Sequence, residues 1–380
     1  MNILVCGAGV SGIFFSIFMK SKYRKANVLL FDKNKIIGKK ILVTGNGRCN
    51  IGNSYVNEYS YNNNYVNEAI KNFSLKEEKL LNEYGIFLRK INNLFYPVSL
   101  SSRALNNYLF SLLEHYKVEL HLEEEILKYT NKNLITNKNN YDFSKLIFCF
   151  GGKSMKSTGS DGSLFNLFNS HGYNIINLRP GLAPIRVKEN VKLLENLRLK
   201  GIIKLINNNK IIYEEEGEVI FKKDGISGIS IFNISSIINR KNLINSIISI
   251  DLFPNFKIDE LKKILLLKFK NFKTDFFESL FGKQFFNYIY KFCNNNVEKY
   301  AYYLKNLNFK YDSTYEFEYS QVTLGGISFN DLDENFESKL EKNIYFLGEC
   351  LDVDGLCGGY NIMFAIYSAY KCSSFIIQSL

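Results

Sequence analysis

The sequence predicts an α/β fold in which both ends of the chain build one parallel-sheet domain and the middle forms a β-rich insertion. Three observations support this prediction. Residues 2–32 read as a strand, a glycine turn, a helix and a second strand, which is the βαβ unit of a parallel sheet. Residues 343–377 read as an apolar strand, a glycine-rich turn and an apolar helix. From about 185 to 309, short strand-like runs precede a helical stretch rich in lysine and aromatic residues.

The length and composition suit a chain of more than one packed unit. The 380 residues are 46% apolar and 22% charged, and a domain usually holds roughly 100–200 residues. We expect a discontinuous domain over 1–185 and 315–380. An inserted β-rich domain is expected over 186–314, with a helical subdomain at about 256–307.

The first part of the chain supplies most elements of the discontinuous domain. Short apolar runs closed by a glycine or an acidic residue predict strands at 2–6, 27–31 and 145–150. Helical periodicity predicts helices at 13–23, 75–84 and 102–116. Ser74 with Glu77 would cap the second of these helices. The runs at 118–122 and 126–129 are expected to form a small antiparallel element.

The insertion is expected to begin with strands and to continue with helices. Its strand-like runs lie at 202–206, 210–213, 218–221 and 247–252. The helical stretch follows at 258–307. A β-type run at 316–323 then leads to the apolar strand at 343–348, and the apolar helix at 360–377 ends the chain.

The cysteines and the apolar N-terminus indicate the compartment. The seven cysteines show neither a CxxC pair nor a framework spacing: Cys6, Cys49, Cys149, Cys293, Cys350, Cys357 and Cys372. This scatter argues against a secreted disulfide protein and favours a reducing cytoplasm. The apolar stretch 3–19 follows no basic residue and is interrupted by glycines, and no other stretch reaches the ~18 apolar residues of a membrane helix. We expect a soluble cytoplasmic protein without a membrane partner.

The net charge is +11, from 48 basic and 37 acidic residues. Such an excess favours polyanionic partners. Composition offers an equal explanation, because the chain is crowded with Lys, Asn, Ile, Phe and Tyr and has no Trp. Both explanations stay open.

The first chemical signal is GAGVSG at 7–12, a GxGxxG run that follows a strand and opens a helix. Gly7 permits the sharp turn, Gly9 lets the backbone approach a pyrophosphate, and Gly12 lets helix and strand pack closely. Asp32 ends the next strand, 20 positions after Gly12, and would bind ribose hydroxyls. The helix start would hold the pyrophosphate. This context predicts dinucleotide binding; a glycine turn without a ligand is the alternative.

The second signal is GKKILVTGNGRCN at 38–50. Gly45 and Gly47 allow successive backbone N–H groups to converge on an anion or an electron-rich ring. Lys40 and Arg48 add positive charge. A surface turn is the alternative for this run.

The third signal is GECLDVDGLCGGYN at 348–361, between the apolar strand and the last helix. It places a second helix start at the edge of the domain. A helix dipole there would stabilise the negative charge of a reduced flavin by roughly 0.3–2 kcal/mol. A structural turn would explain this run alone, but its pairing with an N-terminal GxGxxG favours a cofactor site.

Together these motifs resemble one family, the BaiN/RdsA-like NAD(P)/FAD-dependent oxidoreductases, also known as aminoacetone oxidase family flavoproteins. The resemblance spans the whole chain. GGKS at 151–154 and TGSDG at 158–162 are similar to a GGKS…TGSTGDG segment of the family. Further similar segments are GEVIF at 217–221, GISG at 225–228, VTLGGI at 322–327 and ESK at 337–339.

The resemblance implies a Rossmann-type FAD-binding domain of the two-dinucleotide-binding type, with an inserted β-barrel-like domain that carries a helical subdomain. It assigns the AMP half of FAD to Gly7, Gly9, Gly12, Asp32 and Lys33, with Ile126 beside the adenine. It assigns the flavin to Arg48, Cys49 and Asn50, and its ribityl and pyrimidine side to Gly348, Glu349, Gly358, Gly359 and Asn361. Further expected cofactor-binding residues are Lys40, Gly45, Gly47 and Asp354.

The sequence departs from the family pattern in several places. Asp32 stands where many relatives have Glu, and Asn46 separates two glycines where many have three in a row. Lys222 replaces a Thr after the GEVIF run. The TGSDG segment is two residues shorter than in the family, which puts the role of Asp161 in doubt.

Two absent motifs narrow the expected chemistry. The region after the second strand holds Cys49 without the CxxxxC partner of disulfide reductases, and the chain has no second GxGxxG between a strand and a helix. NAD(P)H would therefore be a transient reductant at the flavin face that the substrate later occupies. Arg48, Cys49 and Tyr360 are the candidate proton donors or substrate anchors. Arg48 would lower the pKa of the Cys49 thiol; alternatively Cys49 packs as a small apolar residue.

Neither histidines nor metal ligands enter this prediction. His115, His121 and His171 fall in ordinary helix or strand contexts, and no spacing suggests a metal site. Flavin itself carries the hydride chemistry, while the protein supplies position, charge and exclusion of water.

The substrate is less determined than the cofactor. The resemblance implies reduction of a carbon–carbon double bond, either in a steroid or in a uridine of ribosomal RNA. Residues 255–310 hold 11 Lys and 5 acidic residues, hence +6 of the net charge, with interleaved aromatics. This segment would contact ribosomal RNA, or is an amphipathic helical core. The alternatives are an oxidase or reductase of a small metabolite (an amine, ketone or enone), and a flavin-binding RNA-associated protein without turnover.

Overall fold

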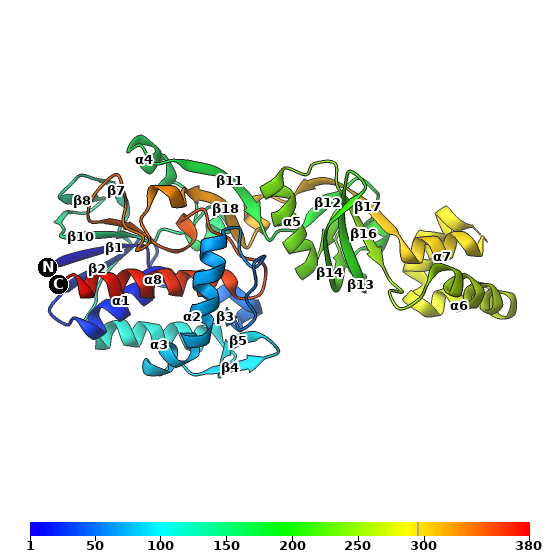
Figure 1. The fold of residues 1–380 in the computed structure, drawn as a ribbon, viewed down its shortest axis with the longest axis horizontal. Helices are drawn as coiled ribbons and strands as arrows, with labels where there is room; N and C mark the ends of the chain where they lie inside the picture. The colour runs from blue at the N-terminus through cyan, green and yellow to red at the C-terminus, as the bar shows by residue number, and fades with distance from the viewer. Residues whose placement is uncertain (295) are drawn as a thin grey trace. The chain divides into compact units, whose positions relative to one another are not determined.

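A computed structural model of the chain describes residues 1–294 and 296–380. The chain forms two compact units. Unit 1 consists of Met1–Arg179 and Val322–Leu380, and unit 2 of Pro180–Gln321. Both chain ends lie in unit 1 (Figure 1). Among the described residues, no helix has the length and apolarity required to cross a bilayer.

Unit 1 is built on a five-stranded parallel sheet in the order β19-β10-β1-β2-β6. The strands are β1 (Asn2–Cys6), β2 (Asn27–Asp32), β6 (Glu119–Leu122), β10 (Lys145–Phe148) and β19 (Ile344–Phe346). β1 lies at the centre with four consecutive buried residues, as expected of a strand covered on both faces. The predicted α/β class is confirmed, and the strand expected from the 118–122 run pairs in this parallel sheet rather than in an antiparallel element.

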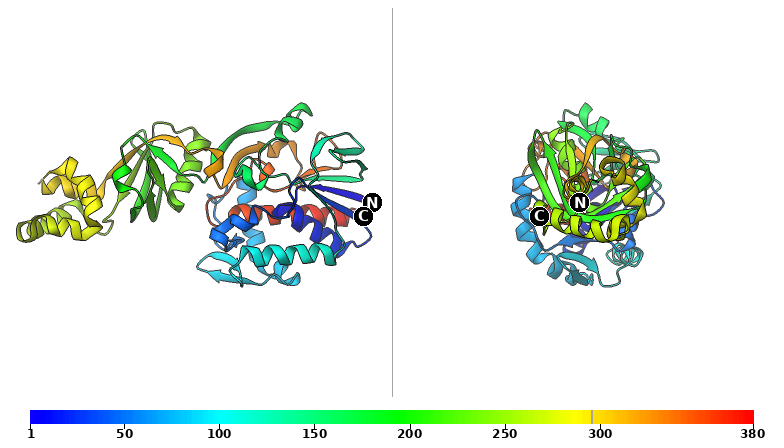
Figure 2. Two further views of the ribbon diagram at one scale, coloured as in Figure 1. Left: turned by 180° about the vertical axis from the view of Figure 1, so that it is seen from behind. Right: turned by 90° about the vertical axis from the view of Figure 1, so that its right-hand side faces the viewer.

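Helices cover one face of this sheet (Figures 1 and 2). α1 (Val10–Lys22) and α8 (Tyr360–Gln378) lie next to the sheet, α3 (Ser102–His115) packs on α1, and α2 (Asn64–Glu83) packs on α8. The short α4 (Phe165–Ser170) lies elsewhere in the unit. α1 packs along α8, so the first and the last helix share one core. Both helices are apolar on most of their surface, as fully buried helices must be.

Small sheets complete unit 1. A three-stranded antiparallel sheet consists of β7 (Ile126–Tyr129), β8 (Asn133–Thr136) and β9 (Asn140–Asp142). A second consists of β3 (Gly52–Asn53), β5 (Leu94–Pro97) and β4 (Leu88–Ile91). A two-stranded sheet joins β11 (Ile175–Gly181) and β18 (Val322–Ile327).

The start of α2 differs from the sequence-based expectation. Asn63 caps the helix by accepting a hydrogen bond from the Val66 N–H. The helix is therefore already in its third turn at Ser74, and neither Ser74 nor Glu77 is part of a cap. The expected start of this helix was wrong because its first turns carry a weak apolar pattern. Residues 62–64 are polar, and Val66 and Ile70 are among the few apolar positions that follow.

Unit 2 contains a closed barrel of six strands in the order β12-β15-β14-β13-β16-β17, which confirms the predicted β-barrel-like insertion. The strands are β12 (Ile185–Val187), β13 (Arg198–Asn207), β14 (Lys210–Phe221), β15 (Gly225–Ser227), β16 (Ile247–Asp251) and β17 (Leu307–Thr314). The separate runs expected at 210–213 and 218–221 form one long strand. α5 (Ile229–Lys241) packs against β14.

Between β16 and β17, unit 2 carries the helices α6 (Ile258–Cys293) and α7 (Val297–Lys305). α6 is interrupted at Lys273 and Gly282, whose backbone angles are not helical. Aromatic side chains form the contact between the two helices. Phe277 stacks on Tyr300 with ring centres 4.2 Å apart.

Candidate functional site

The sequence motifs of unit 1 meet at one edge of the parallel sheet. The GAGVSG run follows β1, Asp32 ends β2, GGKS follows β10 and the 348–361 run follows β19. All four strands are parallel, so their carboxyl ends share this edge. In open α/β sheets this edge is where ligands bind.

In GAGVSG, Gly7 and Gly12 are needed for close packing, whereas Gly9 leaves open space above the backbone. Gly7 has φ +115°, and a methyl group on it would collide with the Cys149 carbonyl oxygen. A methyl group on Gly12 would collide with the Gly7 carbonyl oxygen. Among the described residues nothing lies within 4 Å of the Cβ position of Gly9. Gly9 therefore presents bare backbone at the start of α1, as close approach of a pyrophosphate requires.

Asp32 ties the end of β2 to this turn. Its Oδ2 accepts a hydrogen bond from the Ala8 N–H at 2.8 Å, and its Oδ1 accepts from the Asn34 N–H at 2.8 Å. Lys33 turns to Asp161, with 2.6 Å between Nζ and Oδ2. The shortened TGSDG segment therefore reaches the end of β2. Burial raises the pKa of Asp161, but the hydrogen bonds from Lys33 and Ser163 and the charge of Lys33 together lower it to about 2.

Ile126 lies close to the same strand end. The Glu124 N–H donates to the Asp32 carbonyl at 3.0 Å, which places the chain two residues before Ile126 beside Asp32. Ile126 opens β7 and is half-buried. This position suits the adenine contact that the family resemblance implies.

The GNGRCN run begins inside the 3-10 element Ile41–Gly47, whose backbone is left-handed at Gly45 and Asn46. Gly45, Asn46, Gly47 and Cys49 all have positive φ. Gly47 has no described atom within 4 Å of its Cβ position, and Arg48 is exposed. The run therefore presents accessible backbone at Gly47 and, next to it, the exposed guanidinium of Arg48.

Cys49 does not have the lowered pKa expected from its cationic neighbour. The side chain is 1% exposed, and burial raises the pKa of the thiol to about 11. Arg48 points to solvent instead of pairing with the sulfur. The alternative interpretation, a cysteine that packs as a small apolar residue, describes the structure better.

The turn before α8 is held by side chains of unit 1. Asn361 Nδ2 donates to the Gly355 carbonyl at 3.0 Å and its Oδ1 accepts from the Gly355 N–H at 2.9 Å. Asn53 Nδ2 donates to the Gly358 carbonyl at 3.0 Å. The Tyr360 hydroxyl donates to the Tyr55 carbonyl at 2.6 Å. Asn361 thus stabilises this turn through its two hydrogen bonds to the Gly355 backbone.

The remaining residues expected in this turn lie as follows. Gly348 and Gly359 have φ +73° and +90°, and a methyl group on Gly348 would crowd Ser11 at the start of α1. Asp354 is buried, and its backbone exchanges hydrogen bonds with Asn62. Gly348 therefore lies beside the start of α1.

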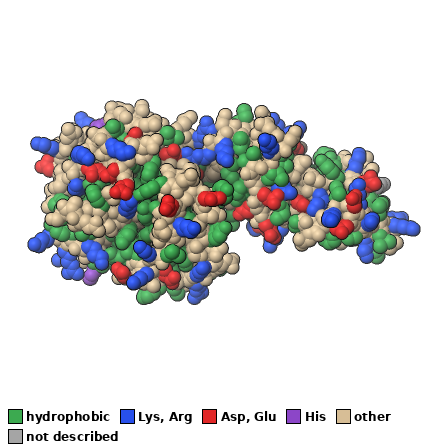
Figure 3. All heavy atoms as spheres, in the orientation of Figure 1, with side chains coloured by type: hydrophobic (Ala, Val, Ile, Leu, Met, Phe, Trp, Pro, Cys, Tyr) green, Lys and Arg blue, Asp and Glu red, His purple; other side chains and the backbone are tan. Residues whose placement is uncertain are grey.

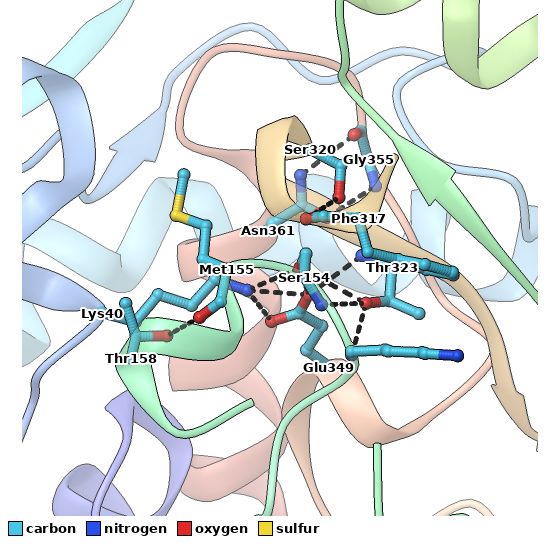
Figure 4. Close-up of polar contacts among 11 residues, drawn as sticks. Lys40, Ser154, Met155, Thr158, Phe317, Ser320, Thr323, Glu349, Gly355 and Asn361 are labelled. Atoms are coloured by element: carbon cyan, nitrogen blue, oxygen red, sulfur yellow. Dashed lines mark hydrogen bonds and ion pairs between the residues drawn. The ribbon is translucent and has the colours of Figure 1, made fainter. Parts of the chain in front are cut away.

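A polar network connects four of the motif segments (Figure 4). Lys40 Nζ lies 2.7 Å from Glu349 Oε2 and donates to Ser154 Oγ at 2.9 Å. Glu349 Oε1 accepts hydrogen bonds from Ser154 Oγ and the Thr323 N–H, both at 3.0 Å. Lys40 and Glu349 were expected at the site. Ser154 and Thr323 were not expected there. The sequence signal that could have found them is a polar side chain close to glycines, in GGKS for Ser154 and in VTLGGI for Thr323.

The helix starts at this edge fit a phosphate and a polar ring. α1 and α8 begin at Gly9 and Gly359 without a side-chain cap, whereas Asn63 and Ser101 cap α2 and α3. The first N–H groups of an uncapped helix need acceptors. Asn50 Oδ1 is buried without a hydrogen-bond partner among the described residues. Open glycines, two uncapped helix starts and an unsatisfied amide together suit FAD.

Comparison with known proteins gives the family. Residues 1–375 match the family model described as HI0933-like protein Rossmann domain. The 3-dehydro-bile acid delta(4,6)-reductase of Clostridium scindens is 27% identical over 97% of this chain and 97% of its own length. The ribosomal RNA dihydrouridine synthase of Escherichia coli is 27% identical over 100% of this chain and 98% of its own length.

Solved structures show the same fold at low sequence identity. A 3-ketosteroid-delta4-(5alpha)-dehydrogenase from Rhodococcus jostii aligns with a TM-score of 0.53 and 10% identity, over 98% of this chain and 95% of that one. A quinol-fumarate reductase aligns with a TM-score of 0.52 and 12% identity, over 99% of this chain and 70% of that one. The chain therefore belongs to the HI0933-like Rossmann-domain family, consistent with the BaiN/RdsA-like group, and is an FAD-dependent oxidoreductase.

Proposed function

We propose that this protein uses FAD, reduced by NAD(P)H, to transfer a hydride to an activated carbon–carbon double bond, and that its substrate is a uridine of ribosomal RNA. The observation behind the proposal is the meeting of the glycine runs, the uncapped helix starts and the Lys40–Glu349 pair at one sheet edge. The relatives' names, a bile acid delta(4,6)-reductase and a ribosomal RNA dihydrouridine synthase, both denote reduction of a carbon–carbon double bond.

The cofactor residues divide between the two halves of FAD. The backbone at Gly9 and the end of β2 at Asp32 would hold the pyrophosphate and the adenosine. The GNGRCN run and the start of α8 would hold the flavin, which supplies the hydride chemistry when bound. The Lys40–Glu349 network joins these segments, so we assign it the role of keeping the cradle rigid.

Arg48 is the leading candidate to anchor the substrate. It is exposed and follows Gly47, above which the described structure is open. A guanidinium can donate two parallel hydrogen bonds to carbonyl oxygens or a phosphate. Cys49 is a weaker candidate because burial raises the pKa of its thiol to about 11. The Tyr360 hydroxyl donates a hydrogen bond to the Tyr55 carbonyl, so the main role we assign to Tyr360 is to stabilise the turn before α8.

The proposed RNA contact is the basic segment 255–310. Its exposed lysines are Lys257, Lys263, Lys268, Lys270, Lys273, Lys283, Lys291, Lys299 and Lys310. Phe272, Tyr290 and Tyr302 are also exposed and could stack on bases. Phe285, Phe286 and Tyr288, which the sequence also suggested for stacking, are buried and belong to the core. On the face seen in Figure 3, lysines and acidic groups are interspersed over α6 and α7. Binding of RNA there would therefore depend on contacts of individual lysines with phosphates rather than on a uniformly positive surface.

The experiment that tests the substrate is mass-spectrometric mapping of dihydrouridine in ribosomal RNA from a strain that lacks this protein. We expect one dihydrouridine to disappear and to return when the wild-type gene is restored. Arg48→Met should not restore it, whereas Arg103→Met, at an exposed arginine of α3, should. An unchanged dihydrouridine map in the deletion strain contradicts the RNA substrate and leaves the flavoenzyme assignment in place.

A small enone is the second candidate substrate, since the bile acid reductase is as similar in sequence as the RNA enzyme. The two candidates differ in salt dependence, because binding to a polyanion weakens steeply with added salt and binding to a neutral ketone does not. A flavin-binding RNA-associated protein without turnover is the third. Stopped-flow reduction by NADH or NADPH, followed by reoxidation with each substrate, separates this last possibility from both enzymes.

A further inference from the structure

One acidic side chain occupies a core position of α2. The buried residues of this helix recur with a helical period: Val66, Asn67, Ile70, Phe73, Ser74, Glu77 and Leu81. Glu77 is 0% exposed, whereas Leu75, two positions earlier, is 82% exposed. The helix thus turns a carboxyl group inward while an apolar side chain faces water. Burying an acidic group is costly unless it is paired, so this inversion calls for a functional explanation.

Glu77 lies against the backbone of Gly52. A methyl group on Gly52 would collide with Glu77 Oε2 and would lie 3.0 Å from Oε1. The φ of Gly52 is not in the left-handed region, so glycine is required there by the space that the carboxyl group takes. Among the described residues, neither oxygen of Glu77 has a hydrogen-bond partner.

Gly52 connects Glu77 to the turn that opens α8. The Cβ position of Gly359 lies 2.6 Å from both the Gly52 carbonyl oxygen and Asn50 Oδ1. The neighbouring Asn53 donates to the Gly358 carbonyl at 3.0 Å. Residues 50–53 therefore form a layer that touches both Glu77 and the start of the last helix. Asn50 and Glu77 are the two unsatisfied groups beside this layer.

Tyr61 is a titratable group whose pKa depends on the charge of Glu77. Tyr61 is 5% exposed, and its hydroxyl donates to the Tyr360 carbonyl at 2.7 Å. Burial, followed by the charges of Glu77 and Tyr360, holds the pKa of Tyr61 well above its usual range. On α2 itself, Lys76 and Glu78 are exposed. Burial raises the pKa of Glu77 to about 8, so the group carries a proton at neutral pH.

We propose that Glu77 is a proton-linked positioning residue of the flavin site. As a neutral acid it supports the 50–53 layer against the start of α8, and when ionised it disfavours the reduced cofactor. Two electrons and one proton entering a bound flavin leave one additional negative charge, which a buried carboxylate of the same sign opposes. When Glu77 is ionised, reduction therefore draws a second proton from solvent onto its carboxylate. The inference rests on the flavin cradle of the proposed function.

The test is the midpoint potential of the flavin-loaded protein between about pH 6 and pH 10, measured for wild type, Glu77→Gln and Glu78→Gln. We expect wild type and Glu77→Gln to agree at pH 6 and to diverge above about pH 8, where the wild-type potential falls more steeply. A tenfold change in the relative affinity for oxidised and reduced flavin corresponds to about 30 mV for a two-electron couple. Glu78→Gln, at an exposed position of the same helix, should follow wild type.

Equal slopes for wild type and Glu77→Gln would overturn the inference, because a purely structural glutamate leaves the slope unchanged. If Glu77→Gln does not fold, infrared difference spectra of the wild type on reduction replace it. A carboxylic acid band that responds to flavin reduction supports the inference, and its absence contradicts it. Protein that binds no flavin contradicts the proposed function as well, whereas loaded protein with equal slopes contradicts the role of Glu77 alone.

Discussion

The carboxyl edge of the unit 1 sheet and the surface of α6 and α7 in unit 2 both hold candidate functional residues, but they are built differently. At the sheet edge, the important positions are glycines, helix starts and buried polar groups such as Thr323, which hold the backbone in one path. On α6 and α7 they are lysines in solvent. A single methyl group is enough to damage the first kind of site, whereas the second depends on summed charge and on salt.

The largest effect is expected for Gly12→Val. Its side chain would meet the Gly7 carbonyl oxygen, and neither backbone can move without disturbing β1 and α1. We expect a loss of about 3 kcal/mol or more in the free energy of unfolding, measured by urea denaturation. A variant with wild-type stability would show that the turn is looser than the structure indicates.

The next effect concerns pH. Glu77 has a pKa raised from 4.5 to about 8 by burial, so between these values the native state binds one proton more than the unfolded state. The free energy of unfolding therefore falls as pH rises from about 4.5 to about 8, by on the order of 5 kcal/mol. Glu77→Gln should remove this part of the slope in denaturation curves recorded at pH 5, 7 and 9. The same slope in both proteins contradicts the raised pKa.

Thr323→Val tests the polar network. Thr323 Oγ1 accepts hydrogen bonds from the N–H groups of Lys153 and Ser154 at 2.7 and 3.0 Å, and valine cannot accept them. We expect a loss of about 1–3 kcal/mol and faster release of FAD, followed by flavin fluorescence. The same substitution at the half-exposed Thr274 of α6 should change stability by less than about 0.5 kcal/mol.

Gly9→Ala separates cofactor binding from folding. The position has φ −84° and open space around its Cβ, so alanine fits the apo fold. If a pyrophosphate approaches this backbone, the methyl group should weaken FAD binding at least tenfold, about 1.4 kcal/mol, with stability of the apo protein unchanged. Titration of apo protein with FAD measures the effect; unaltered affinity places the pyrophosphate elsewhere.

The smallest effect on the cofactor is expected in unit 2. Lys268→Glu, Lys270→Glu and Lys273→Glu together should leave FAD binding and stability nearly unchanged. Affinity for a ribosomal RNA fragment should fall, and the slope of log affinity against log salt should decrease by about one per lost phosphate contact.

The matched triple reversal of the exposed lysines at 71, 76 and 79 on α2 serves as a control. If both triples weaken RNA binding equally, the basic segment has no special role and the net charge of +11 acts as a whole. If neither triple does, RNA is held elsewhere or is not a ligand.

The sequence by itself determined the α/β class, the central strand and the glycine turn after it, because these depend on local rules. A strand followed by GxGxxG and an acid is a pattern of nearest neighbours along the chain. The β-rich insertion was visible for the same reason, as a change from a helical to an alternating period. The helix at 360–377 was likewise predicted within one residue of α8.

Tertiary structure decided which polar residues meet and which side chains are buried. Ser154 and Glu349 are far apart in the sequence and meet because they follow β10 and β19, which end at one edge of the parallel sheet. Thr323, near the start of β18, joins them there. Burial raises the pKa of Cys49, against a smaller lowering by the Thr44 side chain. Glu77, which local pattern assigned to a helix cap, is a core residue because α2 begins at Asn64. Burial and long-range contact are properties of the packed chain, and no local pattern of residues specifies them.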